Sequence, residues 1–325
     1  MKDITISRRS LLVSAGLLAL APLAGCGGNS GSGSGAAGSD YTIGVLQLTE
    51  HSALDAANDG FVKAIKESGL KVKIDQKNAQ NDQSTCKSIA DKFVGDNVNL
   101  IYAIATPAAQ AAGATADIPI VGCAITDYAA SGLVQDNDKP STNVTGASDL
   151  TPVAEQLEMM QKVLPDVKKV GLLYCTAESN SDVQIKAAKK ELNKLGLEYT
   201  DFTVSSSNEI QSVVESAVGK VDALYSPTDN TIAAGASQVG QICKENKLPF
   251  VTGEEGMCMA GGLFTLSINY KDLGYAAGEM AVKILKGEAK PEDMPIKHLS
   301  SKDLVVVKND EMAEALGIDL SALDE

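Results

Sequence analysis

The sequence has no tryptophan and only two histidines, His51 and His298, and aromatic residues make up 4% of its 325 residues. So few histidines leave little room for a metal site or an acid–base pair built on imidazole. The catalytic motifs G-x-S-x-G, H-E-x-x-H and G-x-x-x-x-G-K-S/T are also absent from it. The sequence therefore predicts a protein that is not an enzyme and that needs no cofactor and no metal.

Positive charge is scarce as well. Lysine and arginine number 28 against 42 acidic residues, which gives a formal net charge of −14. Nucleic acids and anionic membrane surfaces are bound by clustered lysine and arginine, so we expect neither as a partner. With 44% hydrophobic residues, the chain is long enough for two domains, each with its own core.

The cysteines form no recognisable framework. Of six in the sequence, one is Cys26 and the other five are Cys86, Cys123, Cys175, Cys243 and Cys258. An odd number without a C-x-x-C pair fits neither a set of disulfides nor a zinc ribbon. We expect free, buried thiols, which indicates an exterior that is not strongly oxidising, although a single disulfide remains an alternative.

Residues 1–25 have the features of a lipoprotein signal peptide. Lys2, Arg8 and Arg9 precede an apolar stretch over residues 11–22 that is too short to span a bilayer. The tetrad Leu-Ala-Gly-Cys at 23–26 resembles the bacterial lipobox, whose cysteine becomes the lipidated N-terminus after cleavage. We therefore expect Cys26 to anchor the chain outside the cytoplasm, to the bacterial cell membrane. The arginine pair leaves general and twin-arginine export both open.

A run rich in glycine and serine follows over residues 26–39. Such a run is typical of a flexible tether between a lipid anchor and a folded domain. Residues 33–38 also match the dinucleotide-binding pattern G-x-G-x-x-G. Because they come before the first predicted strand rather than after it, we reject nucleotide binding.

From residue 41 onward, short β-branched runs alternate with stretches of helical periodicity, which predicts an α/β fold with parallel sheets covered on both faces. The first series has strands at 42–48, 70–74, 100–105 and 118–124 and helices at 54–68, 84–94 and 107–114. The second has strands at 169–174, 198–204, 223–225 and 249–251 and helices at 152–164, 183–195, 209–218 and 231–245.

The two series predict two doubly wound lobes joined by a hinge. We assign residues 41–146 plus 271–292 to one lobe and residues 147–270 plus 293–325 to the other. The chain would then cross three times between the lobes, and a hinged pair of this kind encloses its ligand between facing edges.

Candidate binding residues follow the ends of the predicted strands, where parallel sheets bind their ligands. They are Glu50, His51, Thr106, Pro107, Asp127 and Tyr128 in the first series, and Glu178, Asn180, Ser181, Thr228, Asp229, Asn230, Glu254 and Glu255 in the second. Thr106, Ser181 and Asn230 have the sequence context of helix N-caps, and for each of them capping alone is an alternative role.

Helix N-termini suit a carboxylate and the acidic residues suit an ammonium group, so this set predicts a site for a zwitterion. We expect Thr106 and helix N–H groups to bind the carboxylate, together with Asn180 and Ser181 from the facing lobe. We expect Asp229, with Glu255 or Asp127, to bind the ammonium group.

Five segments carry a resemblance to a known family: residues 44–51, 104–110, 143–146, 226–231 and 253–256. They resemble the substrate-binding lipoproteins of ABC transporters that are often assigned to tryptophan or tyrosine uptake, which have the type 1 periplasmic-binding-protein (Venus flytrap) fold. The resemblance runs over essentially all of residues 41–307. It implies an exported, lipid-anchored monomer that captures an aromatic amino acid and delivers it to a membrane permease and its ATPase.

The scarcity of aromatic residues keeps other ligands open. Tyr128, Tyr174 and Tyr270 are the candidates for packing against an aromatic ring, and each is equally suited to an ordinary core or hinge position. A non-aromatic amino acid or another small organic ligand is therefore an alternative, and so is a sensory lipoprotein that presents its ligand without transport. A sugar ligand is disfavoured by the lack of stacking rings, and an extracellular hydrolase by the missing nucleophile.

Overall fold

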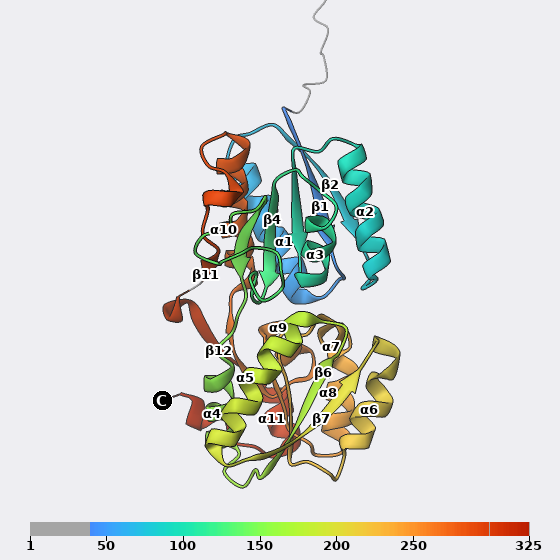
Figure 1. The fold of residues 1–325 in the computed structure, drawn as a ribbon. Helices are drawn as coiled ribbons and strands as arrows, with labels where there is room; N and C mark the ends of the chain where they lie inside the picture. The colour runs from blue at the N-terminus through green and yellow to red at the C-terminus, as the bar shows by residue number, and fades with distance from the viewer. Residues whose placement is uncertain (1–39, 299, 325) are drawn as a thin grey trace, which may run out of the picture. The chain divides into compact units, whose positions relative to one another are not determined.

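The computed structural model describes residues 40–298 and 300–324 (Figure 1). Six parallel strands form one sheet, in the order β11-β5-β4-β3-β1-β2. They are β1 (Tyr41–Gln47), β2 (Val72–Asn78), β3 (Leu100–Ile104), β4 (Ile120–Ile125), β5 (Val144–Ser148) and β11 (Lys297–His298). With helices α1 (Ser52–Glu67), α2 (Gln83–Gly95), α3 (Thr106–Gly113) and α10 (Tyr270–Leu285), this sheet forms what we call the N-terminal lobe.

Helices cover both faces of this sheet. Phe61 of α1 stacks on Tyr102 of β3 with 3.7 Å between the ring centroids, whereas Phe93 of α2 lies directly against Gly44 of β1. Tyr102 pairs with Val45, the neighbour of Gly44, so the two aromatic contacts lie on opposite faces because successive residues of a strand alternate. Helices α1 and α10 pack together on one face, and α2 packs with α3 on the other.

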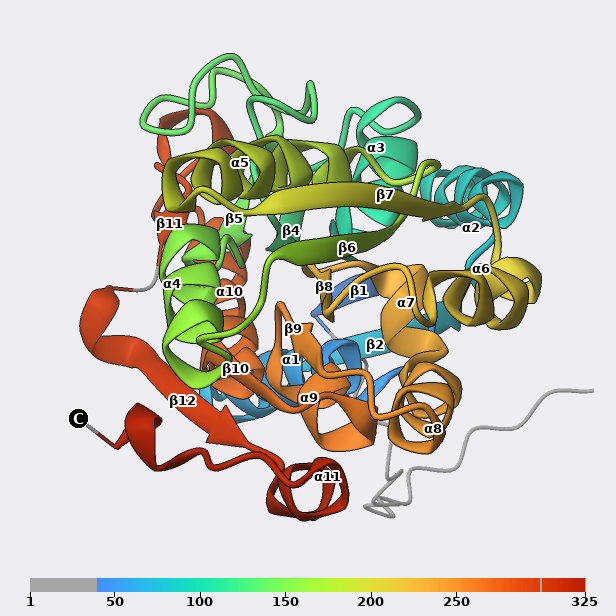
Figure 2. The same cartoon turned by 90° about the horizontal axis from the view of Figure 1, so that it is seen from below.

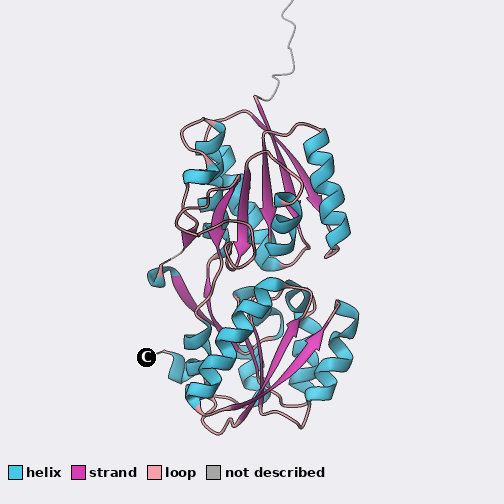
Figure 3. Cartoon of the chain, in the orientation of Figure 1, coloured by secondary structure: helices cyan, strands magenta, loops and turns pink. Residues whose placement is uncertain are grey.

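A second parallel sheet has the order β7-β6-β8-β9, and a two-stranded antiparallel sheet joins β10 to β12 (Figure 2). These strands are β6 (Lys169–Cys175), β7 (Glu198–Val204), β8 (Ala223–Ser226), β9 (Phe250–Thr252), β10 (Phe264–Ile268) and β12 (Leu304–Lys308). The helices are α4 (Val153–Val163), α5 (Ser179–Leu195), α6 (Ile210–Ala217), α7 (Asn230–Ala234), α8 (Ala236–Glu245), α9 (Glu255–Gly261) and α11 (Asp310–Leu316). Together they form what we call the C-terminal lobe, and the predicted α/β fold with two lobes is confirmed (Figure 3).

Three segments connect the lobes. The chain leaves the first sheet after β5, returns between β10 and α10, and crosses again between β11 and β12. The sheet pairings place the boundaries differently from our expectation: β5 extends the N-terminal lobe to Ser148, and β11 pairs with β5, although we assigned 293–325 to the other lobe. Strand β5 was not predicted because its sequence, Val-Thr-Gly-Ala-Ser, has no apolar run.

Other elements differ from the sequence pattern in detail. The predicted helix 231–245 consists of two helices, α7 and α8, because the chain turns at Gly235. Helix α5 begins at Ser179, four residues before the predicted start, and α9 and β10 were not predicted. The five cysteines from Cys86 to Cys258 are free and buried, as expected.

The predicted signal peptide, the tether and Cys26 lie outside the described residues. Within 40–298 and 300–324, no helix has both the length and the apolar character that crossing a membrane requires.

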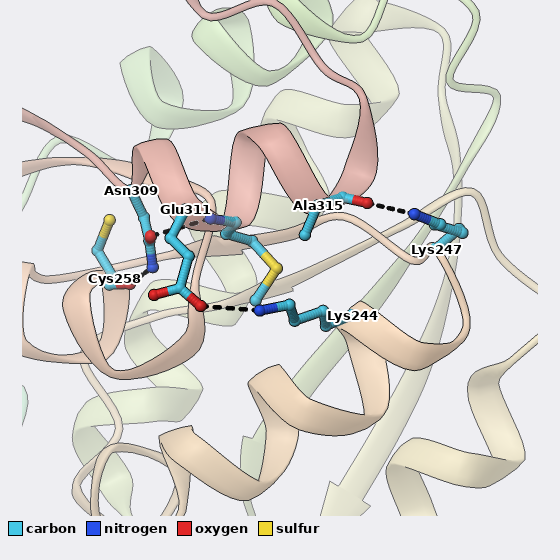
Figure 4. Close-up of polar contacts among 7 residues, drawn as sticks. Lys244, Lys247, Cys258, Asn309, Glu311 and Ala315 are labelled. Atoms are coloured by element: carbon cyan, nitrogen blue, oxygen red, sulfur yellow. Dashed lines mark hydrogen bonds and ion pairs between the residues drawn. The ribbon is translucent and has the colours of Figure 1, made fainter.

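The C-terminal helix α11 is fixed to α8 and α9 by polar contacts (Figure 4). The Asn309 side chain donates to the Cys258 carbonyl at 3.0 Å, and Glu311 pairs with Lys244 at 2.8 Å. The Lys247 ammonium group also contacts the Ala315 carbonyl at the other end of the helix. These contacts attach α11 to the C-terminal lobe.

Close packing of α1 against α10 depends on glycine. A Cβ atom added at Gly274 would lie 1.8 Å from the Ala57 carbonyl oxygen, and one added at Gly60 would lie 1.9 Å from the Lys271 carbonyl oxygen. Both neighbours are backbone atoms of a helix, so neither can move aside without parting the helices.

We predict that Gly274→Ala lowers the free energy of unfolding by about 1–3 kcal/mol, because overpacking forces backbone shifts. Gly95→Ala is the matched control: this helical glycine has open space around its Cβ position, and the change should stabilise by up to about 1 kcal/mol. Urea unfolding measures both. Equal effects of the two changes would contradict the prediction.

Candidate functional site

Residues of both lobes line a small cavity, whose free volume of about 10 Å³ is room for about one water molecule, so a larger ligand requires the lobes to move apart. Its lining consists of His51, Leu54, Ala124, Thr126, Asp149, Asn180, Thr228, Asp229, Asn230, Ala233, Glu254 and Tyr270. Most of these residues follow the carboxyl ends of parallel strands, where open α/β sheets bind their ligands. A larger groove between residues 163–167, 219–222 and 246–248 is open to solvent and lies at the amino ends of strands, so we do not take it as the site.

Five hydrogen bonds join the two lobes. They join Asn81 to Thr231 (3.0 Å), Gln184 to Thr126 (3.3 Å), Gln110 to Ser179 (3.3 Å), Gln83 to the Ala177 carbonyl (3.3 Å) and His51 to Asn230 (3.4 Å). The two lobes therefore contact each other directly through side chains of both.

Asp229 forms the base of the wall in the C-terminal lobe. Its Oδ1 atom caps α7 by accepting from the Ile232 N–H at 2.9 Å. Its Oδ2 atom accepts from the Cys175 N–H and from the Ser181 hydroxyl, both at 2.7 Å. Burial, together with repulsion from Glu178, raises the pKa of Asp229 to about 7. Asp229 therefore orders the surrounding backbone as well as facing the cavity.

Glu178 holds two asparagines of the cavity wall in place. It accepts from the N–H groups and side chains of Asn230 and Thr231 and from the Asn180 amide. Asn180 also donates to the Thr228 carbonyl at 3.1 Å, whereas its Oδ1 atom is buried without a hydrogen-bond partner among the described residues. Glu178 is thus a supporting residue, and Asn180 presents a free acceptor.

The wall next to the hinge contains Asp149, which was not predicted from the sequence. Its Oδ2 atom accepts from the Tyr270 hydroxyl at 3.0 Å and its Oδ1 atom from the Thr126 hydroxyl at 3.3 Å. Burial raises the pKa of Asp149 to about 6. Asp149 directly follows β5, and a position after a strand would have marked it as a candidate site residue. Strand β5 itself was not predicted, so this position was not apparent from the sequence.

Glu254 and Glu255 are separated by the start of α9. The Glu254 carboxylate is buried and caps this helix by accepting from the N–H groups of Gly256 and Met257. Burial raises the pKa of Glu254 to about 7. Glu255 is exposed and does not line the cavity, which removes the basis for our expectation that it binds the ammonium group.

Three other predicted residues lie away from the cavity. Glu50 is exposed at the surface. Asp127 accepts from the Ala130 N–H and the Asn137 amide, and so braces its own loop. Tyr128 is fully buried and its hydroxyl donates to the Ala147 carbonyl at 3.1 Å, so it is a core residue.

The predicted caps differ from the observed ones. Helices α3, α5 and α7 have Ala105, Glu178 and Asp229 at the N-cap position, so Thr106, Ser181 and Asn230 lie inside the first turns instead. Ala105 has φ 81° and ψ 153°, a strained conformation for a residue with a side chain.

Thr106 and Pro107 are both buried and neither lines the cavity. The Thr106 hydroxyl has no hydrogen-bond partner in the part of the chain that is described.

The cavity has an acidic character. Asp149, Asp229 and Glu254 line it, and none of its described lining residues is lysine or arginine. The sequence contains only two arginines, Arg8 and Arg9, both in the predicted signal peptide. Burial lowers the pKa of His51. This effect is larger than the opposite effects of its hydrogen bond to Asn230 and of the nearby acids, which raise the pKa. The lining therefore suits a cationic group, and an anionic group must be bound by neutral donors.

The described residues contain no group of three or more histidine, cysteine or acidic side chains that is arranged to hold a metal ion.

Comparisons with known proteins point to one family. A family model described as "ABC transporter substrate binding protein" matches residues 42–322. A curated tyrosine-binding protein of Clostridioides difficile (strain R20291) is 40% identical over 324 residues, which covers 96% of this chain and 93% of that protein.

Two solved structures are similar over most of the chain. A domain from Streptococcus pneumonia in complex with L-Trp is 39% identical, has a TM-score of 0.84, and covers 88% of this chain and 98% of its own. The second is the ligand-free, open structure of a substrate-binding protein with adhesive properties from Clostridium difficile. It is 45% identical, has a TM-score of 0.65, and covers 86% of this chain and 95% of its own.

We predict that the ligand-free protein loses stability as the pH rises from about 5 to about 7.5. The pKa values of Asp149, Asp229 and Glu254 are raised to about 6, 7 and 7, so in this range the folded state holds protons that the unfolded chain has released. The free energy of unfolding then falls with rising pH.

Urea unfolding at several pH values measures this slope. Asp149→Asn should make it shallower, because one of the three groups no longer titrates. A free energy of unfolding that rises throughout this pH range would refute the prediction.

Proposed function

Because this chain belongs to the family of ABC transporter substrate-binding proteins, which act outside the cytoplasm, we propose that it captures an aromatic amino acid, tyrosine or tryptophan, between its two lobes. Its fold is that of the type 1 periplasmic-binding proteins. The observation that carries the proposal is the cavity lined by both lobes, with three buried carboxylates and no lysine or arginine in its described lining. The role is binding and delivery to a permease and its ATPase, without catalysis.

Asp149 is the residue we propose for the ammonium group of the ligand. The oxygens of Asp229 and Glu254 are occupied by backbone N–H groups, whereas Asp149 accepts only two side-chain hydroxyls, from Thr126 and Tyr270. Asp149 and Glu254 each accept two hydrogen bonds, but those to Glu254 come from the N-terminal N–H groups of α9, where the helix dipole already favours negative charge. At Asp149, an ammonium group supplies both the positive charge and the donors that a buried carboxylate needs.

The ligand carboxylate is proposed to lie between the first turns of α3 and α5. These helices contact each other across the lobes, and in the described chain neither has a side-chain hydrogen bond at its N-cap. Helix N-termini stabilise anions through free N–H groups and the positive end of the helix dipole. The Thr106 hydroxyl in the first turn of α3 is buried without a partner among the described residues, but Thr106 does not line the cavity, so α5 is the stronger candidate. Ser181 is a weaker candidate than expected, because its hydroxyl donates to Asp229.

Closure of the lobes on the ligand is the proposed mechanism of capture. The chain has the higher TM-score with the L-Trp complex, although its sequence identity is higher with the open, ligand-free structure. This difference supports the view that the hydrogen bonds between the lobes belong to the closed arrangement. A ligand favours closure only by the difference in its affinity for the two arrangements.

We predict that L-tyrosine or L-tryptophan stabilises protein that has been unfolded and refolded to remove bound ligand. At a hundredfold excess over Kd, binding adds roughly 2.7 kcal/mol, which raises Tm by about 5–10 °C. Asp149→Asn should weaken binding by roughly 10- to 100-fold, because it removes a charged hydrogen bond.

Thermal-shift titration with all twenty amino acids and several sugars measures both the rise in Tm and the change in Kd. Glu255→Gln is the matched control, since it removes one negative charge at an exposed position and should leave Kd unchanged. No shift with any aromatic amino acid would sink the proposal, and unchanged binding by Asp149→Asn would remove Asp149 from the site.

We also propose that Cys26 carries a lipid anchor and that residues 26–39 act as a tether. The basis is the sequence alone, in which Leu-Ala-Gly-Cys follows an apolar stretch. Cys26→Ser should move the protein from the membrane fraction to the soluble fraction of cells, whereas Ser30→Ala should not. Retention of the Cys26→Ser protein in the membrane fraction would contradict the anchor.

A further inference from the structure

Two buried atoms in the wall of the cavity have no hydrogen-bond partner among the described residues: Asn180 Oδ1 and His51 Nδ1. Buried polar atoms are nearly always paired, because an unpaired one costs about 1–3 kcal/mol. Two such atoms in one cavity indicate groups that a ligand satisfies. Which ligand group can do so depends on whether each atom donates or accepts.

The surrounding hydrogen bonds fix the role of Asn180. Its amide nitrogen donates to Glu178 Oε2 and to the Thr228 carbonyl, both at 3.1 Å, and both of these partners only accept. The nitrogen is therefore correctly assigned, and the unpaired atom is the amide oxygen. Asn180 Oδ1 is an acceptor.

The same reasoning fixes the tautomer of His51. The Asn230 amide nitrogen donates to Glu178 at 2.6 Å, so the Asn230 oxygen is the atom that faces His51 Nε2 at 3.4 Å. An oxygen acceptor requires that Nε2 carries the proton. Burial lowers the pKa of His51, which favours the neutral ring, and in the neutral ring Nδ1 is then an acceptor. Nδ1 does not cap α1, although His51 occupies the N-cap position.

The apolar part of the cavity lies beside His51. Leu54 follows His51 by three residues and Ala233 follows Asn230 by three, so each lies about one helical turn from the His51–Asn230 pair. The acids of the hinge wall form a separate group, in which Asp149 bonds to Tyr270 and repulsion from Asp149 adds to the raised pKa of Glu254. Leu54 and Ala233 thus give the lining beside His51 two apolar side chains, although Asp229 also lines the cavity next to Asn230.

We propose that His51 is a specificity-determining residue whose Nδ1 atom accepts a hydrogen bond from a donor on the ring of the ligand, a phenol O–H or an indole N–H. The cavity then selects tyrosine and tryptophan over phenylalanine. The inference rests on the proposed function, since it concerns the ring of an aromatic amino acid whose ammonium group is held at Asp149. Asn180 Oδ1 accepts from that ammonium group and does not discriminate among ring types.

The energetic basis is the cost of an unpaired acceptor. A ring without a donor leaves Nδ1 buried and unpaired. Sites built to hydrogen-bond a substrate group reject analogues that lack it far more strongly than they reject a difference in size. We expect at least about a tenfold discrimination from this one contact.

The test compares ligands that differ in one donor, by isothermal titration calorimetry on ligand-stripped protein. L-tryptophan is paired with its benzothienyl analogue, in which sulfur replaces the indole N–H, and L-tyrosine is paired with L-phenylalanine. The proposal predicts that the member with the donor binds at least about tenfold more tightly in at least one pair.

Two variants separate the acceptor from the shape of the side chain. His51→Phe keeps a flat ring without an acceptor and should bring the affinity ratio of each pair to about one. His51→Gln keeps an acceptor and should preserve part of the preference.

Each outcome decides the proposal. Equal binding of both members of both pairs to the wild-type protein overturns the role of His51 and leaves the proposed function standing. Binding of none of the four ligands overturns both. A preference that persists undiminished in His51→Phe also overturns it, and if that variant does not fold, the two ligand pairs on the wild-type protein decide.

Discussion

The hydrogen bond from Tyr270 to Asp149, 3.0 Å long, joins two of the three segments that connect the lobes. Asp149 directly follows β5, where the chain first leaves the N-terminal lobe, and Tyr270 begins α10, where the chain returns to it. The two residues are 121 positions apart in sequence, and both are nearly fully buried. This contact places a carboxylate at the hinge and in the wall of the cavity at once, so the hinge and the binding site share a residue.

Burial of acidic groups gives the cavity its chemical preference. Removing a carboxylate from water disfavours its charged form, which is why the pKa values of Asp149, Asp229 and Glu254 are all raised. Closure without a ligand therefore buries acids that have no cation beside them in the described lining. An ammonium group supplies the missing charge, so a ligand that carries one stabilises the closed arrangement more than the separated one.

The overall fold was accessible from sequence because local patterns agree with it. Strand β7 occupies the predicted range 198–204, and buried apolar runs such as β3 and β4 mark central parallel strands. Among the residues chosen at strand ends, those that line the cavity are His51, Asn180, Thr228, Asp229, Asn230 and Glu254. Residues chosen at strand ends come together because the carboxyl ends of parallel strands meet at one edge of each sheet, whatever the details of packing.

The rest of the site depends on contacts that no local pattern encodes. Glu254 and Glu255 are chemically alike, and only the start of α9 decides that Glu254 caps the helix while Glu255 faces solvent. Thr106 was expected to cap α3, but the positive φ of Ala105 starts the helix one residue earlier. Asp149 could not be predicted as a site residue, because its hydrogen bond to Tyr270 joins positions far apart in the sequence.

The number of protons released on ligand binding tests the central claim most directly. If the ligand ammonium group lies on Asp149, whose pKa in the unliganded protein is about 6, binding lowers that pKa and expels a proton from the protonated fraction. Calorimetric titration of L-tyrosine or L-tryptophan at pH 6, in two buffers of different ionisation enthalpy, counts these protons. We predict net release by the wild-type protein and a smaller release by Asp149→Asn. Zero release or net uptake of protons by the wild-type protein would contradict the claim that the buried carboxylates bind the ammonium group.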